Sequence, residues 1–76
     1  MTGSVSNKNL LIVEDNRALL TGIKQWFCGV NSVTTAETLA EAKRAVFERF
    51  FDIILLDVVL PDGNGLDLIP LLKNKT

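Results

Sequence analysis

The chain has 76 residues, of which 47% are hydrophobic and 22% are charged, and its formal net charge is −1 at pH 7. This length fits one domain at most, and the hydrophobic share favours a folded globule over a disordered segment. The sequence contains no histidine, which excludes histidine-based catalysis. Its basic residues do not cluster, which argues against nucleic acid binding. No apolar run approaches the roughly 18 residues that a membrane span needs.

Residues 1–7 are polar and lack the apolar centre of a signal peptide. We therefore expect a flexible lead there, followed by one domain over residues 8–76 of a cytoplasmic protein. Residues 10–13 form a short, continuous apolar run, which predicts a buried strand. Two acids, Glu14 and Asp15, follow this run directly. The first strand is thus expected to deliver two carboxylates at its C-terminal end.

A helix is expected next, because Asn16 can cap its first turn and apolar residues then recur at helical spacing. These apolar residues are Leu19, Leu20, Ile23, Trp26 and Phe27. Gly29 supplies a stop signal for the helix. The valine and the two threonines within residues 31–35 then predict a short second strand.

A second helix is indicated by Thr38 and Glu41, which have the spacing of a capping box. Its apolar face comprises Leu39, Ala42, Ala45, Val46 and Phe50. Residues 52–56 then predict a third strand, apolar enough to be buried on both faces as in a parallel sheet. This strand also ends on a carboxylate, that of Asp57.

The segment over residues 58–65 reads as a long turn, since it contains Pro61, Gly63 and Gly65. Beyond it the sequence predicts a third helix, which Pro70 should kink or shorten. The apolar residues of this helix are Leu66, Leu68, Ile69, Leu71 and Leu72. The resulting order, β-α-β-α-β-α, predicts an α/β fold with a parallel sheet and right-handed crossovers.

A strand order of 2-1-3 would put the first helix on one face of the sheet and the second and third helices on the other. Strands one and three would then be neighbours, and their C-terminal ends would meet at the topological switch point, where ligands bind in open α/β sheets. We therefore expect Glu14, Asp15 and Asp57 to lie within several ångströms of one another.

Such a cluster favours a proton or a cation, because like charges 4 Å apart repel by about 1 kcal/mol in water and by about 4 kcal/mol at an intermediate dielectric. Mg²⁺ suits a site of this kind, since it takes one or two carboxylates together with waters and a phosphate oxygen. A carboxylate can itself attack a phosphoryl group. Asp57 is therefore a candidate nucleophile as well as a candidate metal ligand.

Three segments of the sequence closely resemble the receiver domain of two-component response regulators. They are residues 13–16 (VEDN), 53–57 (IILLD) and 60–66 (LPDGNGL). The motifs are specific in combination, and the resemblance extends over roughly residues 8–75. It implies a flavodoxin-like fold and a signalling module that accepts phosphate, without turnover as an enzyme.

The resemblance also implies roles for individual residues. Asp57 would accept phosphate from a sensor histidine kinase, Asp15 would bind Mg²⁺, and Glu14 would support the metal through water. The backbone carbonyl of Val59 would be a further metal ligand. Pro61 and Gly65 would shape the loop after Asp57. Asp62 is interpreted as a turn residue and Asp67 as an acid on the surface of a helix.

The sequence departs from the family in its extent. Receiver domains resemble a five-stranded sheet with five helices, whereas this chain stops after its third helix, so a truncated receiver domain is expected. The Ser or Thr that ends the family's fourth strand and the Lys that ends its fifth cannot be assigned here. Phosphorylation is therefore expected to be impaired, because a positioned cation stabilises the transferring phosphoryl group.

The third strand should be an open edge of this shortened sheet, with unpaired backbone groups and bare apolar surface. We therefore expect a homo-oligomer, most simply a two-fold dimer, formed through that edge or through the bare sheet face.

Three other functions stay open at this point. The same fold could serve as a dimerisation or interaction module without phosphorylation. A metal-dependent phosphohydrolase would resemble a pattern with a second Asp two positions after Asp57, where this chain has Val59. A nucleotide-binding βαβ protein is disfavoured, because the turn over residues 14–17 has no glycine and the wrong charge for phosphate.

Overall fold

The computed structural model describes residues 7–27, 29 and 31–73, which form the predicted alternation of strands and helices with one small hairpin added. Residues 1–6 of the expected flexible lead lie outside the described residues. The elements are β1 Asn9–Val13, α1 Arg17–Phe27, β2 Ser32–Ala36, α2 Leu39–Glu48, β3 Ile53–Leu56, β4 Val59–Leu60, β5 Gly63–Asn64, the 3₁₀ helix η1 Gly65–Leu68 and α3 Ile69–Lys73.

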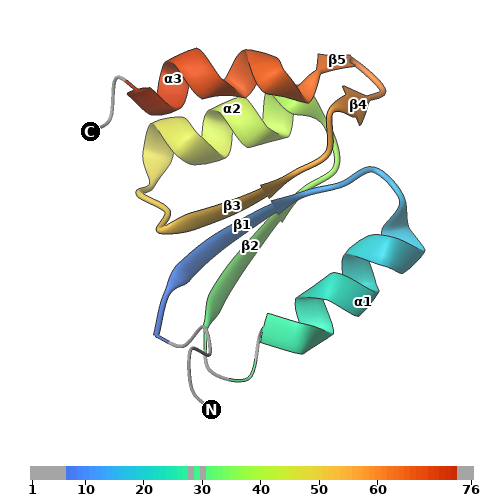
Figure 1. Cartoon of the computed structure of the whole chain (residues 1–76), viewed down its shortest axis with the longest axis vertical. Coiled ribbons are helices and arrows are strands. Elements are labelled where there is room, and N and C mark those ends of the chain that lie inside the picture. Colours follow the sequence, from blue (N-terminus) through green and yellow to red (C-terminus); the bar gives the residue numbers. More distant parts are fainter. Residues whose placement is uncertain (1–6, 28, 30, 74–76) are drawn as a thin grey trace.

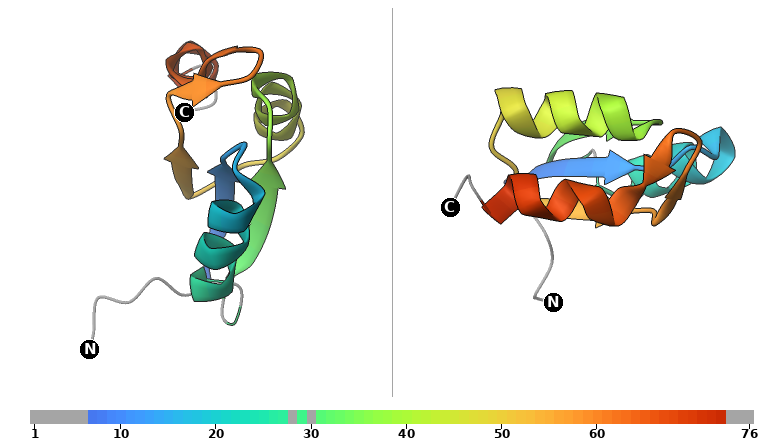
Figure 2. Two further views of the ribbon diagram at one scale, coloured as in Figure 1. Left: turned by 90° about the vertical axis from the view of Figure 1, so that its right-hand side faces the viewer. Right: turned by 90° about the horizontal axis from the view of Figure 1, so that it is seen from above.

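The main sheet has the predicted order β2-β1-β3, and all three strands are parallel. The central strand β1 pairs on both sides, so that Leu10 lies opposite Val33 of β2 and Ile53 of β3. Helix α1 covers one face of the sheet, while α2 and α3 lie together over the other (Figure 1). Figure 2 shows the same three layers from two further directions. The described fold therefore matches the predicted strand order and helix placement.

The core is centred on β1, whose four residues from Leu10 to Val13 are at most 1% exposed. Leu11 and Val13 pack with the buried residues of α2, with Leu60 and with Leu68. Thr38 caps α2 as predicted, because its side-chain oxygen accepts the Glu41 amide at 3.1 Å. No helix in the described part of the chain is long and apolar enough to cross a membrane.

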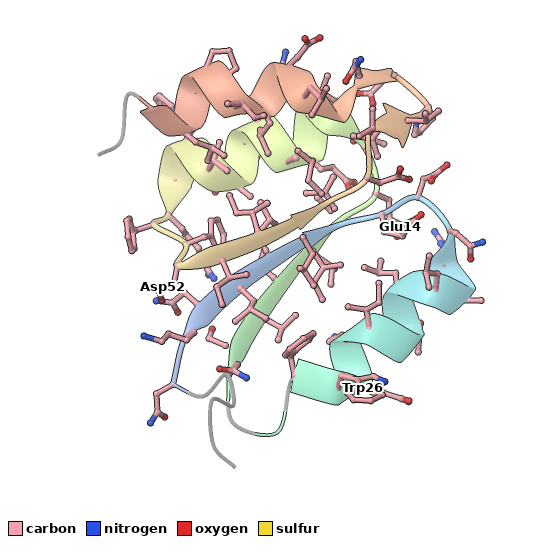
Figure 3. The ribbon with its side chains drawn as sticks, viewed as in Figure 1. Glu14, Trp26 and Asp52 are labelled. Carbon is pink, nitrogen blue, oxygen red and sulfur yellow. The ribbon has the colours of Figure 1, made fainter. Side chains whose placement is uncertain are left out.

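The exposed faces of the helices differ from the sequence prediction. On α1 only Leu20 is buried, whereas Leu19 is 50% exposed and Trp26 is 86% exposed. The predicted apolar stripe is wider than the face that the sheet covers, and Trp26 points away from the sheet (Figure 3). Phe50 was expected on the buried face of the second helix, but α2 ends at Glu48 and Phe50 is 60% exposed.

The expected third helix is divided into η1 and α3, with Pro70 in the first turn of α3. Proline is tolerated at that position because the first amides of a helix have no partner within the helix. The predicted shortening is therefore observed, and the break falls before the proline.

Candidate functional site

The candidate site lies at the C-terminal ends of β1 and β3, which are neighbouring parallel strands. Backbone hydrogen bonds continue past the strand ends and fix the acids there. The amide of Asp57 donates to the carbonyl of Val13 at 3.0 Å, and the amide of Glu14 donates to the carbonyl of Ala36 at 2.9 Å. The backbones that carry Glu14 and Asp57 are therefore tied to adjacent strands of one rigid sheet.

The structure brings together the three acids that the sequence singled out. Glu14, Asp15 and Asp57 each offer one carboxylate oxygen, and these three oxygens lie within 4.8 Å of one another. Glu14 and Asp57 are half-buried and Asp15 is exposed. Glu14 lies beyond the C-terminal end of β1, at the opposite end of the sheet from Asp52 (Figure 3). The predicted proximity is thus observed, while the roles of the three residues stay predictions.

The electrostatics of this cluster follow from its crowding. Partial burial, the charges of Asp57 and Asp15 and a side-chain hydrogen bond with Asp57 raise the pKa of Glu14 above its ordinary value. The amide of Asn16, which donates to Glu14 Oε2 at 3.2 Å, opposes this shift in pKa. The ionised form of Glu14 is therefore disfavoured, and a bound cation would relieve that cost.

The donor set suits a hard divalent cation. It consists of carboxylate oxygens, which Mg²⁺ prefers, and all three acids are at least partly exposed, which leaves room for water and phosphate oxygens. The described residues 7–27, 29 and 31–73 contain no histidine or thiolate near the cluster that would favour a softer metal. The chemistry of the site therefore fits the expected Mg²⁺.

Asp57 is oriented by the segment that follows it. The amide of Val59 donates to Asp57 Oδ1 at 3.2 Å, which holds one carboxylate oxygen in place. Val59 begins β4 and is 76% exposed, so the residue whose carbonyl was predicted as a ligand lies beside the acids at the surface. Val59 thus contributes a contact to the nucleophile candidate that sequence reasoning did not identify.

Position 65 requires a glycine because the backbone there lies very close to Asp57. A Cβ atom at this position would collide with the backbone carbonyl of Asp57 and press on the side chain of Leu56. The amide of Gly65 also donates to the carbonyl of Val58 at 2.7 Å. The expectation that Gly65 shapes this loop is confirmed, because only glycine allows the chain to pass so close to Asp57.

Sequence reasoning missed the hairpin between these residues. Val59 pairs with Asn64 and Leu60 with Gly63, so that Pro61 and Asp62 form a two-residue turn. The carboxylate of Asp62 reaches the first turn of α2, where it accepts the amides of Leu39 at 2.7 Å and of Ala40 at 3.0 Å. The sequence shows only that Asp62 lies in a tight turn. It does not indicate the contact itself, because Leu39 and Ala40 lie 23 and 22 residues away from Asp62.

A cavity of about 690 Å³ lies elsewhere, between β2 and α2. None of the three clustered acids lines it. Mg²⁺ takes carboxylate oxygens and keeps several waters, so we place the chemistry at the acid cluster and not in this cavity.

A three-layer parallel α/β domain with carboxylates clustered at its topological switch point belongs to the class of open α/β domains that bind ligands at the carboxyl ends of their strands. The sequence model of the response regulator receiver domain matches residues 10–76. The chain therefore belongs to the receiver domain family of two-component response regulators, in which phosphorylation on Asp, an acidic Mg²⁺ site and interaction with histidine kinases are general.

Individual relatives agree with this assignment. The chain is 37% identical over 70 residues to the DNA-binding transcriptional regulator NtrC of Azospirillum brasilense, covering 91% of this chain and 15% of that protein. It is 35% identical over 71 residues to the transcriptional regulatory protein DcuR of Escherichia coli, and the match covers 87% of this chain and 30% of DcuR. It thus spans less than a third of either relative.

A solved structure gives the same result. The non-phosphorylated receiver domain of HemR from Leptospira biflexa is similar with a TM-score of 0.74 and 33% identity, covering 88% of this chain and 55% of that one. This chain therefore corresponds to about half of that solved chain.

Proposed function

We propose that this chain is the phosphoacceptor part of a response regulator, with Asp57 as the phosphorylated residue. The observation that carries the proposal is the convergence of three carboxylate oxygens within 4.8 Å at the ends of β1 and β3. Glu14, Asp15, Asp57 and the carbonyl of Val59 would hold Mg²⁺. The metal supplies charge neutralisation on the transferring phosphoryl group.

The chain's own residues would perform the transfer as follows. An oxygen of Asp57 attacks the phosphorus of a phosphohistidine on the kinase, and a new P–O bond forms as the P–N bond breaks. The electron pair of the broken bond stays on the imidazole nitrogen, which takes up a proton. The Val59 amide donates to Asp57 Oδ1 and so orients the carboxylate that would attack. The step makes the chain a substrate of its kinase, and we do not assign it turnover as an enzyme.

The test is incubation with acetyl phosphate and Mg²⁺ followed by intact-mass measurement. We expect a gain of one phosphoryl group that disappears when Mg²⁺ is chelated. Asp57→Asn is the matched control because it keeps the shape of the side chain and removes the charge. A mass gain that persists in this variant would overturn the assignment of Asp57.

We infer further that phosphorylation of this segment alone is slow. In support, partial burial and the neighbouring carboxylates of Asp57 and Asp15 raise the pKa of Glu14, so negative charge is crowded at the site. A site without a positioned cation stabilises a transferring phosphoryl group less well. A chain that gained phosphate as fast as an intact receiver domain would contradict this inference.

A second candidate function, an interaction module, is favoured by the exposure of β3. This strand is an edge of the sheet, and all four of its apolar residues are only half-buried. We propose a two-fold dimer through this edge or the adjoining sheet face, in a cytoplasmic protein that does not use this segment to bind nucleic acid. Sedimentation at micromolar concentration should give a dimer, and a compact monomer would contradict the proposal.

A further inference from the structure

The turn residue Asp62 joins two parts of the molecule that are distant in sequence. It lies between β4 and β5, five positions after Asp57, yet its two carboxylate oxygens each accept an amide from the start of α2. Oδ1 accepts from Leu39 at 2.7 Å and Oδ2 accepts from Ala40 at 3.0 Å. These two hydrogen bonds lower the pKa of Asp62 below its ordinary value, so the acid is ionised at neutral pH.

The contact is reinforced by packing. Leu60 and Leu39 belong to the same buried core cluster. A Cβ atom at Gly63, next to Asp62, would stand 2.9 Å from Leu39 Cδ2, so the hairpin backbone lies directly on the Leu39 side chain. The hairpin is therefore held against the first turn of α2 by one ionic cap and by apolar contact.

The same hairpin carries the group that orients Asp57. Val59 opens β4, and its amide donates to Asp57 Oδ1 at 3.2 Å. The position of Val59 relative to the acid cluster depends on how the hairpin is seated, because β4 and β5 form a two-stranded sheet of their own, separate from the main sheet in the part of the chain that the structure describes. Asp62 is the polar anchor of that hairpin on a neighbouring helix.

We propose that Asp62 is a positioning residue for the acid cluster: by capping α2 it seats the hairpin and so sets the place of the Val59 amide and carbonyl beside Asp57. This inference rests on the proposed function as far as Mg²⁺ binding is concerned. Residues that orient a metal site from outside its ligand set typically change metal affinity about 10- to 100-fold when they are removed.

A matched pair of variants separates positioning from helix stability. Thr38 caps the same helix by accepting the Glu41 amide at 3.1 Å, but it belongs to α2's own N-terminus and not to the hairpin. Asp62→Ala and Thr38→Ala each remove a capping side chain from α2, and only the first releases the hairpin. Asp67→Asn, on the exposed side of η1, removes the same charge without touching the contact.

The first measurement is the Mg²⁺ dissociation constant of the whole chain, followed through backbone amide shifts in NMR spectra. We expect Asp62→Ala to weaken binding about tenfold, whereas Thr38→Ala and Asp67→Asn change it by less than about twofold. Asp62→Asn should restore most of the affinity, because its amide oxygen still accepts one hydrogen bond. Equal weakening by Asp62→Ala and Thr38→Ala, or by Asp62→Ala and Asp67→Asn, would overturn the proposal.

The second measurement needs no metal. Hydrogen exchange of the Val59 amide in Mg²⁺-free protein should accelerate in Asp62→Ala and stay unchanged in Thr38→Ala. Failure of the wild-type chain to bind Mg²⁺ would count against the proposed function, while the exchange rates would still decide the role of Asp62. Unchanged exchange at Val59 in Asp62→Ala would refute positioning by Asp62.

Discussion

The two strands that carry the acid cluster, β1 and β3, have similarly apolar sequences and very different surroundings. From Leu10 to Val13, β1 is at most 1% exposed, whereas each residue of β3 is half-buried. The central strand has a partner on either side, while β3 pairs with β1 and with no other strand of the described residues. The difference teaches that neighbours set burial, and that a strand can present a functional acid at its end while its own edge stays open.

The largest expected effect is the loss of stability when a side chain of β1 is truncated, compared with the same change in β3. Leu11→Ala removes a fully buried side chain and should lower the free energy of unfolding by roughly 3 kcal/mol. Ile54→Ala in β3 should cost roughly half as much, because that side chain is already half in water. Urea denaturation of both variants measures the difference. The measurement is made at protein concentrations low enough to dissociate the proposed dimer, and equal costs under those conditions would contradict the comparison.

The next effect concerns the chain that leaves β3. Gly65→Ala places a methyl group against the carbonyl of Asp57 and should lower the free energy of unfolding by about 1–3 kcal/mol. The control is Gly22→Ala in α1, where a new Cβ would have no atom within 4 Å apart from its chain neighbours and the nearby backbone of its own helix. There, replacing a helical glycine should stabilise the fold by up to about 1 kcal/mol. Thermal unfolding of the two variants should therefore shift in opposite directions.

The smallest effect tests the charge at the end of β1. Because the folded-state pKa of Glu14 is raised, its contribution to stability is fully present below the ordinary carboxylate range and is lost as pH rises through the folded pKa. Gln at position 14 cannot ionise, so the Glu14→Gln variant does not lose stability in this way as the pH rises. Without Mg²⁺ its free energy of unfolding at pH 7 should therefore exceed that of the wild type by up to about 1 kcal/mol.

Denaturation curves at pH 4 and pH 7 would measure this difference. The difference in free energy of unfolding between Glu14→Gln and the wild type should be smaller at pH 4, where Glu14 takes up a proton. A variant that is less stable than wild type at both values would show that Glu14 is stabilised, not strained, by its neighbours.

The sequence was sufficient to predict the main sheet, because β1 and β3 are continuous apolar runs and the alternation with helices permits few topologies. The meeting of Asp15 and Asp57 followed from that topology alone. These features depend on short-range patterns and on one rule for parallel strands, both of which can be read from the chain.

Other features could not be predicted, because they depend on contacts between distant segments. The hairpin of β4 and β5 consists of two-residue strands, too short to show any periodicity. The cap by Asp62 joins residues 23 positions apart. The exposure of Trp26 depends on how much of α1 the sheet covers, and helical spacing says nothing about that width.

The central claim is that β1 and β3 bring Asp15 and Asp57 to one divalent ion, and a Mg²⁺ titration of four proteins tests it most directly. These are the wild type, Asp15→Asn, Asp57→Asn and the double variant, followed by backbone amide shifts. We predict saturable shifts at the ends of both strands in the wild type, and at least about tenfold weaker binding in each single variant, a loss of about 1.4 kcal/mol. Because both acids would serve one ion, the loss in the double variant should be smaller than the sum of the single losses. Shifts confined to one strand end, or binding unaffected by Asp57→Asn, would contradict the account.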